Sequence, residues 1–183
     1  FTVVQWNNLG YYYIASSFGG RGEIAPQQEL IDAYEEGDAR RDWSIYGDQE
    51  GAAHGTKYPT TAGGENPHVI RFGEVILTKA EALAQQGRLD EAVTEYNRIR
   101  VRAALEPHVL NEDVTTQQEV LEAIWHERRL ELAFEGDRFS DLRRTGRAVE
   151  VLGIPSYQSS DPIPQAEIDV SPNLTQHPEY GGS

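Results

Sequence analysis

The sequence AIWHERRLELAFEGDRFSDLRR, residues 123–144, carries ten charged residues among its 22 and still keeps a helical pattern of apolar residues. Steps of four, three and four separate Ile124, Arg128, Glu131 and Glu135. Side chains at this spacing lie along one face of a helix. We therefore predict a long helix that starts near residue 116, runs to residue 135 and carries charges of both signs on one line.

A second group of charges follows the bend expected at Gly136. Arg138, Asp141 and Arg144 are spaced by three residues, which places them on one face of a short second helix. Because aromatic and leucine side chains fill most other directions, a solvated charged face is the less favoured alternative. We expect a partly buried arginine-carboxylate network that fixes a helix corner and contains Arg128, Glu131, Glu135, Arg138, Asp141 and Arg144.

The same stretch does not predict catalysis. His126-Glu127 begins like a zinc-protease motif, but the position four beyond the histidine is Leu130, so the second zinc ligand is missing. Glu127 and Glu131 could stand at a glycosidase spacing, yet the neighbouring arginines favour ionised carboxylates rather than a proton donor. We predict no catalytic residue, no metal site and no cofactor.

Length and composition narrow the class of protein. The 183 residues suffice for one core of ordinary size, and no apolar run is long enough to span a membrane. A formal charge of −14 repels nucleic acid, and the lack of cysteine excludes disulfides and thiol chemistry. The chain opens in what reads as the middle of a strand and shows no signal peptide. We expect it to be part of a longer protein.

The middle of the chain predicts paired helices. Asn66-Pro67 reads as a helix start, and apolar residues recur at helical spacing up to Gly87, where a second helix follows. Small and aromatic residues stand where a tetratricopeptide repeat places them, at Ala80, Ala92 and Tyr96. Thr116 and Glu119 predict a capping box. The fold class is therefore mainly α, with tetratricopeptide-like hairpins, and one repeat alone should leave an apolar strip exposed.

Three segments are expected. Residues 1–65 read as rich in strand and loop and as the ligand side, with a strand over residues 1–18 and a short helix over residues 26–36. Residues 66–146 form the helical core. The proline-rich residues 147–183 form an extended tail that wraps over the domain.

Aromatic residues outside the predicted helices suit a neutral sugar. A ring packs on the C–H face of a sugar, while amides and carboxylates take its hydroxyl groups. Some of these rings could instead belong to the core. The candidate ligand-binding residues are Trp6, Asn7, Tyr11, Tyr12, Trp43 and Tyr46. Trp43 is preferred as the platform because it enters a long glycine-rich loop.

Several motifs together resemble one family. Residues 127–144 resemble the signature ERRxELxFEGxRxxDLxR of the SusD/RagB family. Four further pieces agree with the family in the same order: PQQELIDAYEEGDAR (residues 26–40), RFGEVILTKAEALAQQG (71–87), YNRIR (96–100) and DPIPQAEIDVSPNLTQHPEY (161–180). Residues 44–65 show no motif of the family.

The resemblance implies the C-terminal part of a SusD-like α/α superhelix. It also implies a non-enzymatic lipoprotein on the bacterial surface that binds oligosaccharide or another nutrient and delivers it to a SusC-like, TonB-dependent transporter of the outer membrane. Its lipid anchor would lie upstream of Phe1. A tetratricopeptide-type scaffold for a protein partner is the alternative, and a glycoside hydrolase is the third possibility.

Overall fold

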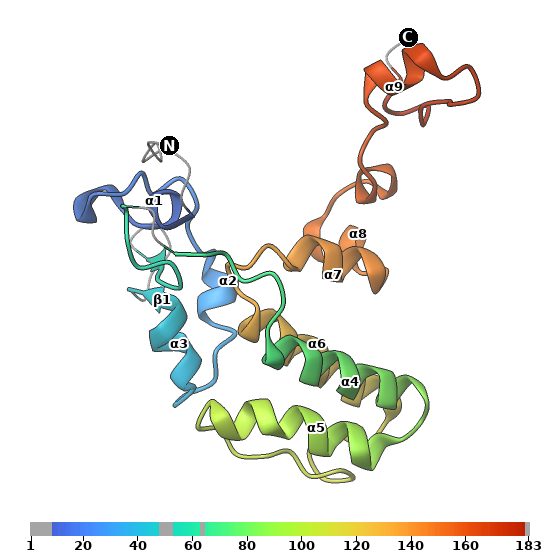
Figure 1. The fold of residues 1–183 in the computed structure, drawn as a ribbon. Helices are drawn as coiled ribbons and strands as arrows, with labels where there is room; N and C mark the ends of the chain where they lie inside the picture. The colour runs from blue at the N-terminus through green and yellow to red at the C-terminus, as the bar shows by residue number, and fades with distance from the viewer. Residues whose placement is uncertain (1–8, 48–52, 63–64, 182–183) are drawn as a thin grey trace. The chain divides into compact units, whose positions relative to one another are not determined.

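The computed structural model describes residues 9–47, 53–62 and 65–181. It forms two compact units, one ending at Gly136 and the other beginning at Asp137. Across the described residues helices dominate, which confirms the prediction of a mainly α chain (Figure 1).

The first unit contains most of the regular structure. Its helices are α1 (Leu9–Tyr13), the 3-10 turn η2 (Ser16–Phe18), α2 (Gln28–Ile31), α3 (Ala39–Ser44), α4 (Phe72–Gln85), α5 (Leu89–Arg102) and α6 (Gln117–Glu131). Two short strands, β1 (Ile45–Tyr46) and β2 (His54–Gly55), pair antiparallel. In their register Tyr46 lies opposite His54. These two side chains therefore leave the hairpin on the same face.

Helices α4 and α5 form the predicted hairpin (Figure 1). The chain turns at Gly87, whose φ of +74° favours glycine. Ala80, Ala92 and Tyr96 are each 0% exposed, as the tetratricopeptide-like spacing predicted. The two alanines let the helices approach closely, and the tyrosine fills the space beside them.

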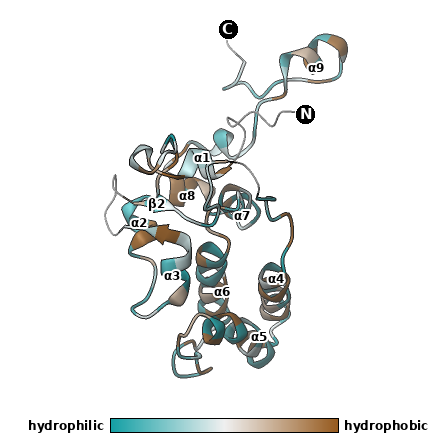
Figure 2. Cartoon of the chain, turned by 60° about the vertical axis from the view of Figure 1, so that its left-hand side comes forward, coloured by the Kyte–Doolittle hydropathy of each residue, from teal (hydrophilic) through white to brown (hydrophobic). Residues whose placement is uncertain are grey.

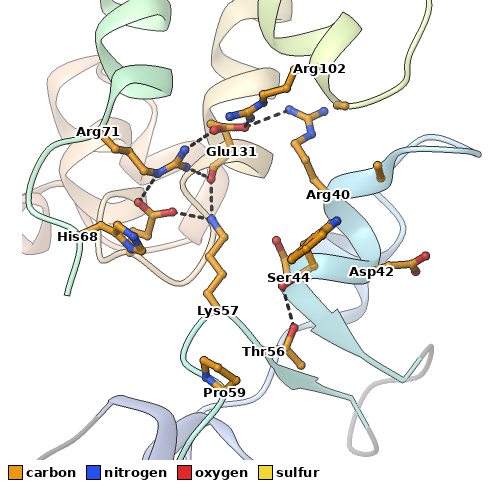
Figure 3. A pocket seen from close by; sticks show the side chains of 14 residues that line it. Arg40, Asp42, Ser44, Thr56, Lys57, Pro59, His68, Arg71, Arg102 and Glu131 are labelled. Atoms are coloured by element: carbon orange, nitrogen blue, oxygen red, sulfur yellow. Dashed lines mark hydrogen bonds and ion pairs between the residues drawn. The ribbon is translucent and has the colours of Figure 1, made fainter. Parts of the chain in front are cut away.

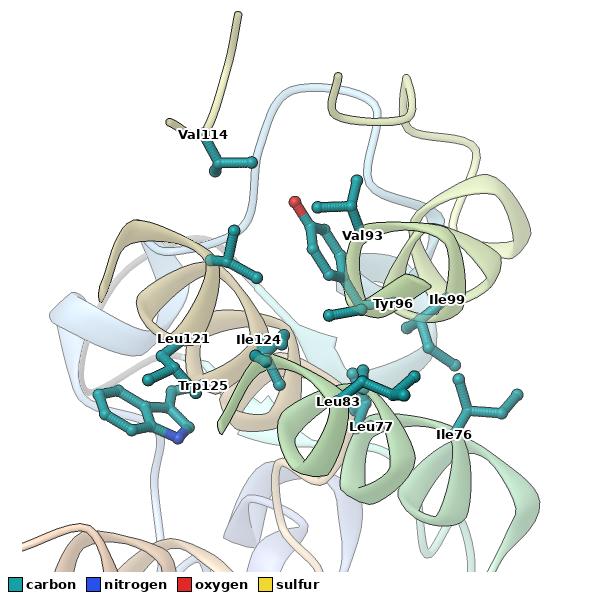
Figure 4. Close-up of a cluster of buried hydrophobic side chains, with 14 residues drawn as sticks. Ile76, Leu77, Leu83, Val93, Tyr96, Ile99, Val114, Leu121, Ile124 and Trp125 are labelled. Atoms are coloured by element: carbon teal, nitrogen blue, oxygen red, sulfur yellow. The ribbon is translucent and has the colours of Figure 1, made fainter. Parts of the chain in front are cut away.

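Helix α6 closes the core against this hairpin. Figure 4 shows its Leu121, Ile124 and Trp125 beside Leu77 and Tyr96 of the hairpin. Polar and apolar segments alternate along all three helices, as expected where each buries one face (Figure 2). These three helices share the larger buried hydrophobic cluster.

The predicted capping box starts α6. Thr116 accepts a hydrogen bond from the Glu119 amide at 3.2 Å, and the Glu119 carboxylate accepts one from the Thr116 amide at 3.0 Å. Bonds from Thr115 and Thr116 lower the pKa of Glu119 to about 2. The capping prediction is confirmed.

Both expected helix limits beside the charged stretch are wrong. Helix α4 begins at Phe72 rather than at Asn66-Pro67, because Arg71 is extended and its side chain bonds to carboxylates of another element. Helix α6 ends at Glu131 rather than at residue 135. Phe134 adopts a left-handed φ of +66°, and its carbonyl accepts a hydrogen bond from the Tyr13 hydroxyl at 3.2 Å. Long-range contacts override local propensity at both places.

The strand expected over residues 1–18 is wrong in its described part. Residues 9–13 form α1. Within it Gly10 lies directly against the backbone carbonyls of Tyr58 and Thr60, an approach that only glycine allows. The short helix expected over residues 26–36 is reduced to α2. Residues 1–8, with the start of that strand, lie outside the described residues.

The second unit consists of short elements: α7 (Arg138–Arg144), α8 (Ala148–Leu152), the 3-10 turn η3 (Ser156–Ser159) and α9 (Gln165–Val170). The tail is thus less extended than expected, with prolines between its short helices. Tyr157 packs against His177 and Tyr180 at ring-centroid distances of 5.9 and 4.9 Å. That the tail wraps over the domain stays a prediction. None of the helices in the described ranges is long and apolar enough to cross a membrane.

Candidate ligand-binding site

Two carboxylates one turn apart on α6 organise the first unit. Glu127 is 1% exposed and accepts hydrogen bonds from Arg40 of α3 at 2.7 Å and from Arg100 of α5 at 2.6 Å. Arg40 also bonds to Asp38, the residue before α3, at 2.6 Å. One buried carboxylate therefore joins three helices.

Glu131 makes the second junction. It is 3% exposed and forms ion pairs with Arg71, at the start of α4, and with Arg102, at the end of α5. Glu135 accepts from Arg71 at 2.7 Å and from Lys57 at 2.6 Å. The Lys57 ammonium also donates to the backbone carbonyl of Glu131 at 2.6 Å. Figure 3 shows these groups converging from four segments of the chain.

The network keeps its acids ionised. Burial alone would raise the pKa of Glu131, but hydrogen bonds from Arg102 and Arg71 outweigh it and hold that pKa below the ordinary value. The pKa of Glu135 is likewise lowered, since bonds from Arg71 and Lys57 exceed the effect of burial. Both groups are therefore hydrogen-bond acceptors at neutral pH rather than proton donors.

A cavity of about 680 Å³ opens beside this network. Its lining includes Arg40, Asp42, Trp43, Ser44, Thr56, Lys57, His68, Arg71, Arg102, Glu131 and Glu135 (Figure 3). Trp43 contributes the one large ring of this lining and is 79% exposed. The volume lies in the range of small-molecule sites.

The arrangement suits binding of a polar molecule. An exposed indole ring offers a flat apolar surface, and the paired charges present hydrogen-bonding groups that cannot reorient. No group of three histidine, aspartate or glutamate side chains in the described ranges could hold a metal ion. The ring and the polar groups of this lining suit recognition of a polar molecule.

Comparison with known proteins identifies the family. Residues 52–161 match the SusD family. The chain belongs to the SusD family. It is 30% identical over 176 residues to the starch-binding protein SusD of Bacteroides thetaiotaomicron, covering 88% of this chain and 29% of that protein. It is 41% identical over 92 residues to SusD-like protein P38 of Formosa agariphila, covering 46% of this chain and 18% of that protein.

Solved structures support the same assignment. A SusD superfamily protein from Bacteroides vulgatus superposes with a TM-score of 0.77 at 28% identity, over 92% of this SusD-family chain and 47% of that chain. A second superfamily protein, from Bacteroides thetaiotaomicron, shares the fold with a TM-score of 0.78 at 21% identity. The chain thus spans less than a third of the two curated relatives and about half of the first solved structure.

The structure separates the aromatic candidates of this SusD-family chain. Trp43 lies on α3, so the expectation that it stands outside the helices, at the entry of a long loop, is wrong. It lines the large cavity, whereas Tyr46 lines a second, smaller one. Tyr11 and Tyr12 are half-buried, pack edge to face on each other at 6.2 Å and line neither cavity. Trp6 and Asn7 lie outside the described residues. Their roles in binding stay predictions.

The six residues predicted to form one charged network are divided between the two units: Arg128, Glu131 and Glu135 lie in the first, and Arg138, Asp141 and Arg144 lie in the second. Arg128 pairs with Glu74 at 3.1 Å in the first unit, where Glu131 and Glu135 also lie. In the second unit, Asp141 pairs with Arg144 at 2.6 Å and with Arg147 at 3.3 Å. Arg138 opens α7 in that unit. A single network of all six stays a prediction.

Four cations of the site were not among the predicted residues: Arg40, Lys57, Arg71 and Arg102. Arg40 and Arg71 are the terminal arginines of two motifs, residues 26–40 and 71–87, that resemble the family, and this signal could have found them. Lys57 lies in the stretch without a motif. Its partner Glu135 comes from 78 residues further along the chain.

Proposed function

We propose that this chain supplies part of the ligand-binding surface of a cell-surface lipoprotein that binds neutral oligosaccharide without cleaving it. In this proposal the protein passes its ligand to a SusC-like, TonB-dependent transporter in the outer membrane. Membership of the SusD family supports the proposal, together with the name of one relative, the starch-binding protein SusD of Bacteroides thetaiotaomicron.

The observation that carries the proposal is the position of Trp43. Its ring is 79% exposed at the margin of a cavity whose wall is a network of paired charges. Covering an exposed indole with the apolar face of a ligand removes apolar surface from water, which is favourable. A sugar can cover the ring with its C–H face and direct its hydroxyl groups toward the polar wall.

The charges of the cavity favour a neutral ligand. Arg40, Lys57, Arg71 and Arg102 each form an ion pair with a carboxylate, so their charges are already balanced. The chain as a whole carries −14, which repels polyanions at low salt. An acidic glycan would therefore have to displace an existing partner.

The state of the carboxylates supports binding without hydrolysis. A glycosidase needs one acid whose pKa is raised, so that it can protonate the leaving group. The pKa of Glu131 is lowered instead, and Glu127 accepts bonds from two arginines. Glu131 is therefore not suited to donate a proton, and both oxygens of Glu127 are already engaged by arginines.

One observation favours the alternative of a protein-binding scaffold. Val69 and Ile70, which precede α4, are 86% and 73% exposed, and Phe72 and Val75 in the first turns of α4 are 67% and 49% exposed. Apolar side chains are therefore exposed at this end of the hairpin and in the segment before it. A protein partner could cover them, independently of any sugar.

The two functions can be tested with one pair of variants. The full-length protein is titrated with neutral and with uronic-acid oligosaccharides, and binding is measured by calorimetry and by tryptophan fluorescence. Only the neutral oligosaccharides should bind. Trp43→Ala should weaken this binding strongly, whereas Phe72→Ala, which removes another exposed ring, should leave it intact. Unchanged affinity in Trp43→Ala, or a preference for uronic acids, would contradict the proposal. Loss of a protein partner in Phe72→Ala alone would support the scaffold.

A further inference from the structure

A second cavity of about 420 Å³ lies beside the β1–β2 hairpin. It is lined by Phe18, by Tyr46 and His54 of the hairpin, and by the segment that starts at Pro59. Pro59 also lines the large cavity that contains Trp43. The two cavities therefore adjoin each other at this proline.

Three rings form one wall of the second cavity. The imidazole of His54 lies 5.1 Å from the ring of Tyr46 and 5.3 Å from the ring of Phe18, measured between centroids. Phe18 and Tyr46 are 5.2 Å apart. The two outer rings are 57% and 54% exposed, while His54 is only 6% exposed. A ligand would thus meet two open ring surfaces around one buried polar group.

The buried imidazole has an unused hydrogen-bonding atom. Nδ1 of His54 is buried and finds no hydrogen-bond partner in the described part of the chain. Buried polar atoms without partners are rare because they lose their bonds to water without compensation. Because this atom has no surface open to water, a ligand reaches it only when the rings beside it move apart, and a hydrogen bond made there would recover that loss.

The chemistry of the wall selects the class of ligand. Burial lowers the pKa of His54, so the imidazole is neutral at pH 7 and Nδ1 either donates or accepts, according to its tautomer. A hydroxyl group can match either tautomer because it both donates and accepts. No lysine or arginine is among the described residues of this lining, so an anionic group has no counter-charge there.

We propose that this cavity is a second carbohydrate subsite, which holds one neutral sugar ring against Phe18 and Tyr46 with a hydroxyl group on Nδ1 of His54. The proposal rests on the proposed function and extends it. An oligosaccharide whose first ring covers Trp43 can reach the second subsite across Pro59. The protein then discriminates chain length, since short sugars occupy one cavity and longer ones occupy both.

Affinity as a function of oligosaccharide length tests the proposal. We expect Phe18→Ala to weaken binding of long neutral chains about 3- to 10-fold and to leave disaccharide affinity unchanged. His54→Phe keeps a ring of similar shape and removes only Nδ1. It should weaken long chains about 2- to 10-fold. Trp43→Ala should weaken chains of every length. Phe72→Ala is the matched control with an exposed ring elsewhere.

A direct measurement separates failure of this subsite from failure of the proposed function. Nitrogen-15 resonances of the His54 ring are followed in Trp43→Ala while a neutral monosaccharide is added. A saturable shift at His54, with no shift at His177, supports the subsite. Absence of a shift overturns it even where the wild-type protein binds sugar at Trp43. Wild-type affinity in both Phe18→Ala and His54→Phe at every length also overturns it. A shift produced by phenol and not by sugar would assign the cavity to aromatic ligands instead.

Discussion

A Cβ atom at Gly73 would lie 2.6 Å from Oε1 of Glu131, closer than any side chain can approach. Gly73 is buried in the first turn of α4, two residues after Arg71. The missing side chain leaves the room that the carboxylate occupies while it pairs with Arg71. The helix start and the charged network therefore depend on each other.

Gly73→Ala should destabilise the protein. In an exposed helix the same change would stabilise by about 0.5–1 kcal/mol, because glycine is a poor helix former. Here the added methyl group displaces the Glu131 carboxylate, and we expect a loss of about 1–3 kcal/mol in the free energy of unfolding. Urea denaturation measures it. When Glu131→Ala is also present, Gly73→Ala should no longer lower the free energy of unfolding. If the losses of the two single variants simply add in the double variant, the two residues are not coupled.

Arg71→Ala should be among the costlier single changes at this site. It leaves Glu131 and Glu135, whose side chains are 2% and 6% exposed, without one of their cations. Leaving a buried charge without its partner lowers the free energy of unfolding by about 3–5 kcal/mol. Because Arg102 still pairs with Glu131 and Lys57 still pairs with Glu135, we expect a loss near the lower value. Arg88→Ala breaks a solvent-exposed pair with Glu91 and serves as the control. Equal melting temperatures for the two variants would show that the network contributes nothing.

Local signals account for the part of the fold that the sequence predicts. The capping box at Thr116, the turn at Gly87 and the small residues Ala80 and Ala92 all act within one hairpin or one helix turn. Such signals can be read from spacing alone. The mainly α class follows from them.

The charged site depends on contacts that spacing cannot show. Arg71 meets Glu131 from 60 residues away, and Arg40 meets Glu127 from 87 residues away. A sequence shows that arginines and acids are present, but the partners are set only when the elements pack. The same packing ends α6 at Glu131, because Phe134 turns back toward Tyr13. The sequence therefore predicts where α4 and α6 lie better than it predicts where they begin and end, because long-range contacts set those limits.

The network should make stability depend on acid pH. The pKa values of Glu131 and Glu135 are lower in the folded protein than the ordinary value of 4.5. A lowered folded pKa gives stability that is fully present above about pH 4.5 and is lost as the pH falls through the folded pKa. The urea concentration at the unfolding midpoint should therefore decrease as the pH is lowered below about 4.5. In a Glu131→Gln, Glu135→Gln double variant the fall should be smaller, and an identical pH profile would assign the acid sensitivity to other groups.

The last prediction concerns the hairpin that carries Tyr46 and His54. A Cβ atom at Gly55 would lie 2.8 Å from Cδ1 and 2.9 Å from Cε1 of the Phe134 ring. That ring cannot move freely, since it packs edge to face on Tyr13 at 5.4 Å and Phe134 is in a left-handed conformation. Gly55→Ala should therefore push β2 away from Phe134.

We expect Gly55→Ala to lower the free energy of unfolding by about 1–3 kcal/mol, the usual cost of overpacking a core. Because β2 carries His54, affinity for long neutral oligosaccharides should fall as well, while affinity for disaccharides at Trp43 should change less. Phe134→Leu in the same chain removes the ring carbons that clash and should restore part of both losses. Calorimetric melting and titration of the single and double variants measure this. A double variant no better than Gly55→Ala would mean that the methyl group acts on the strand pairing itself and not on Phe134.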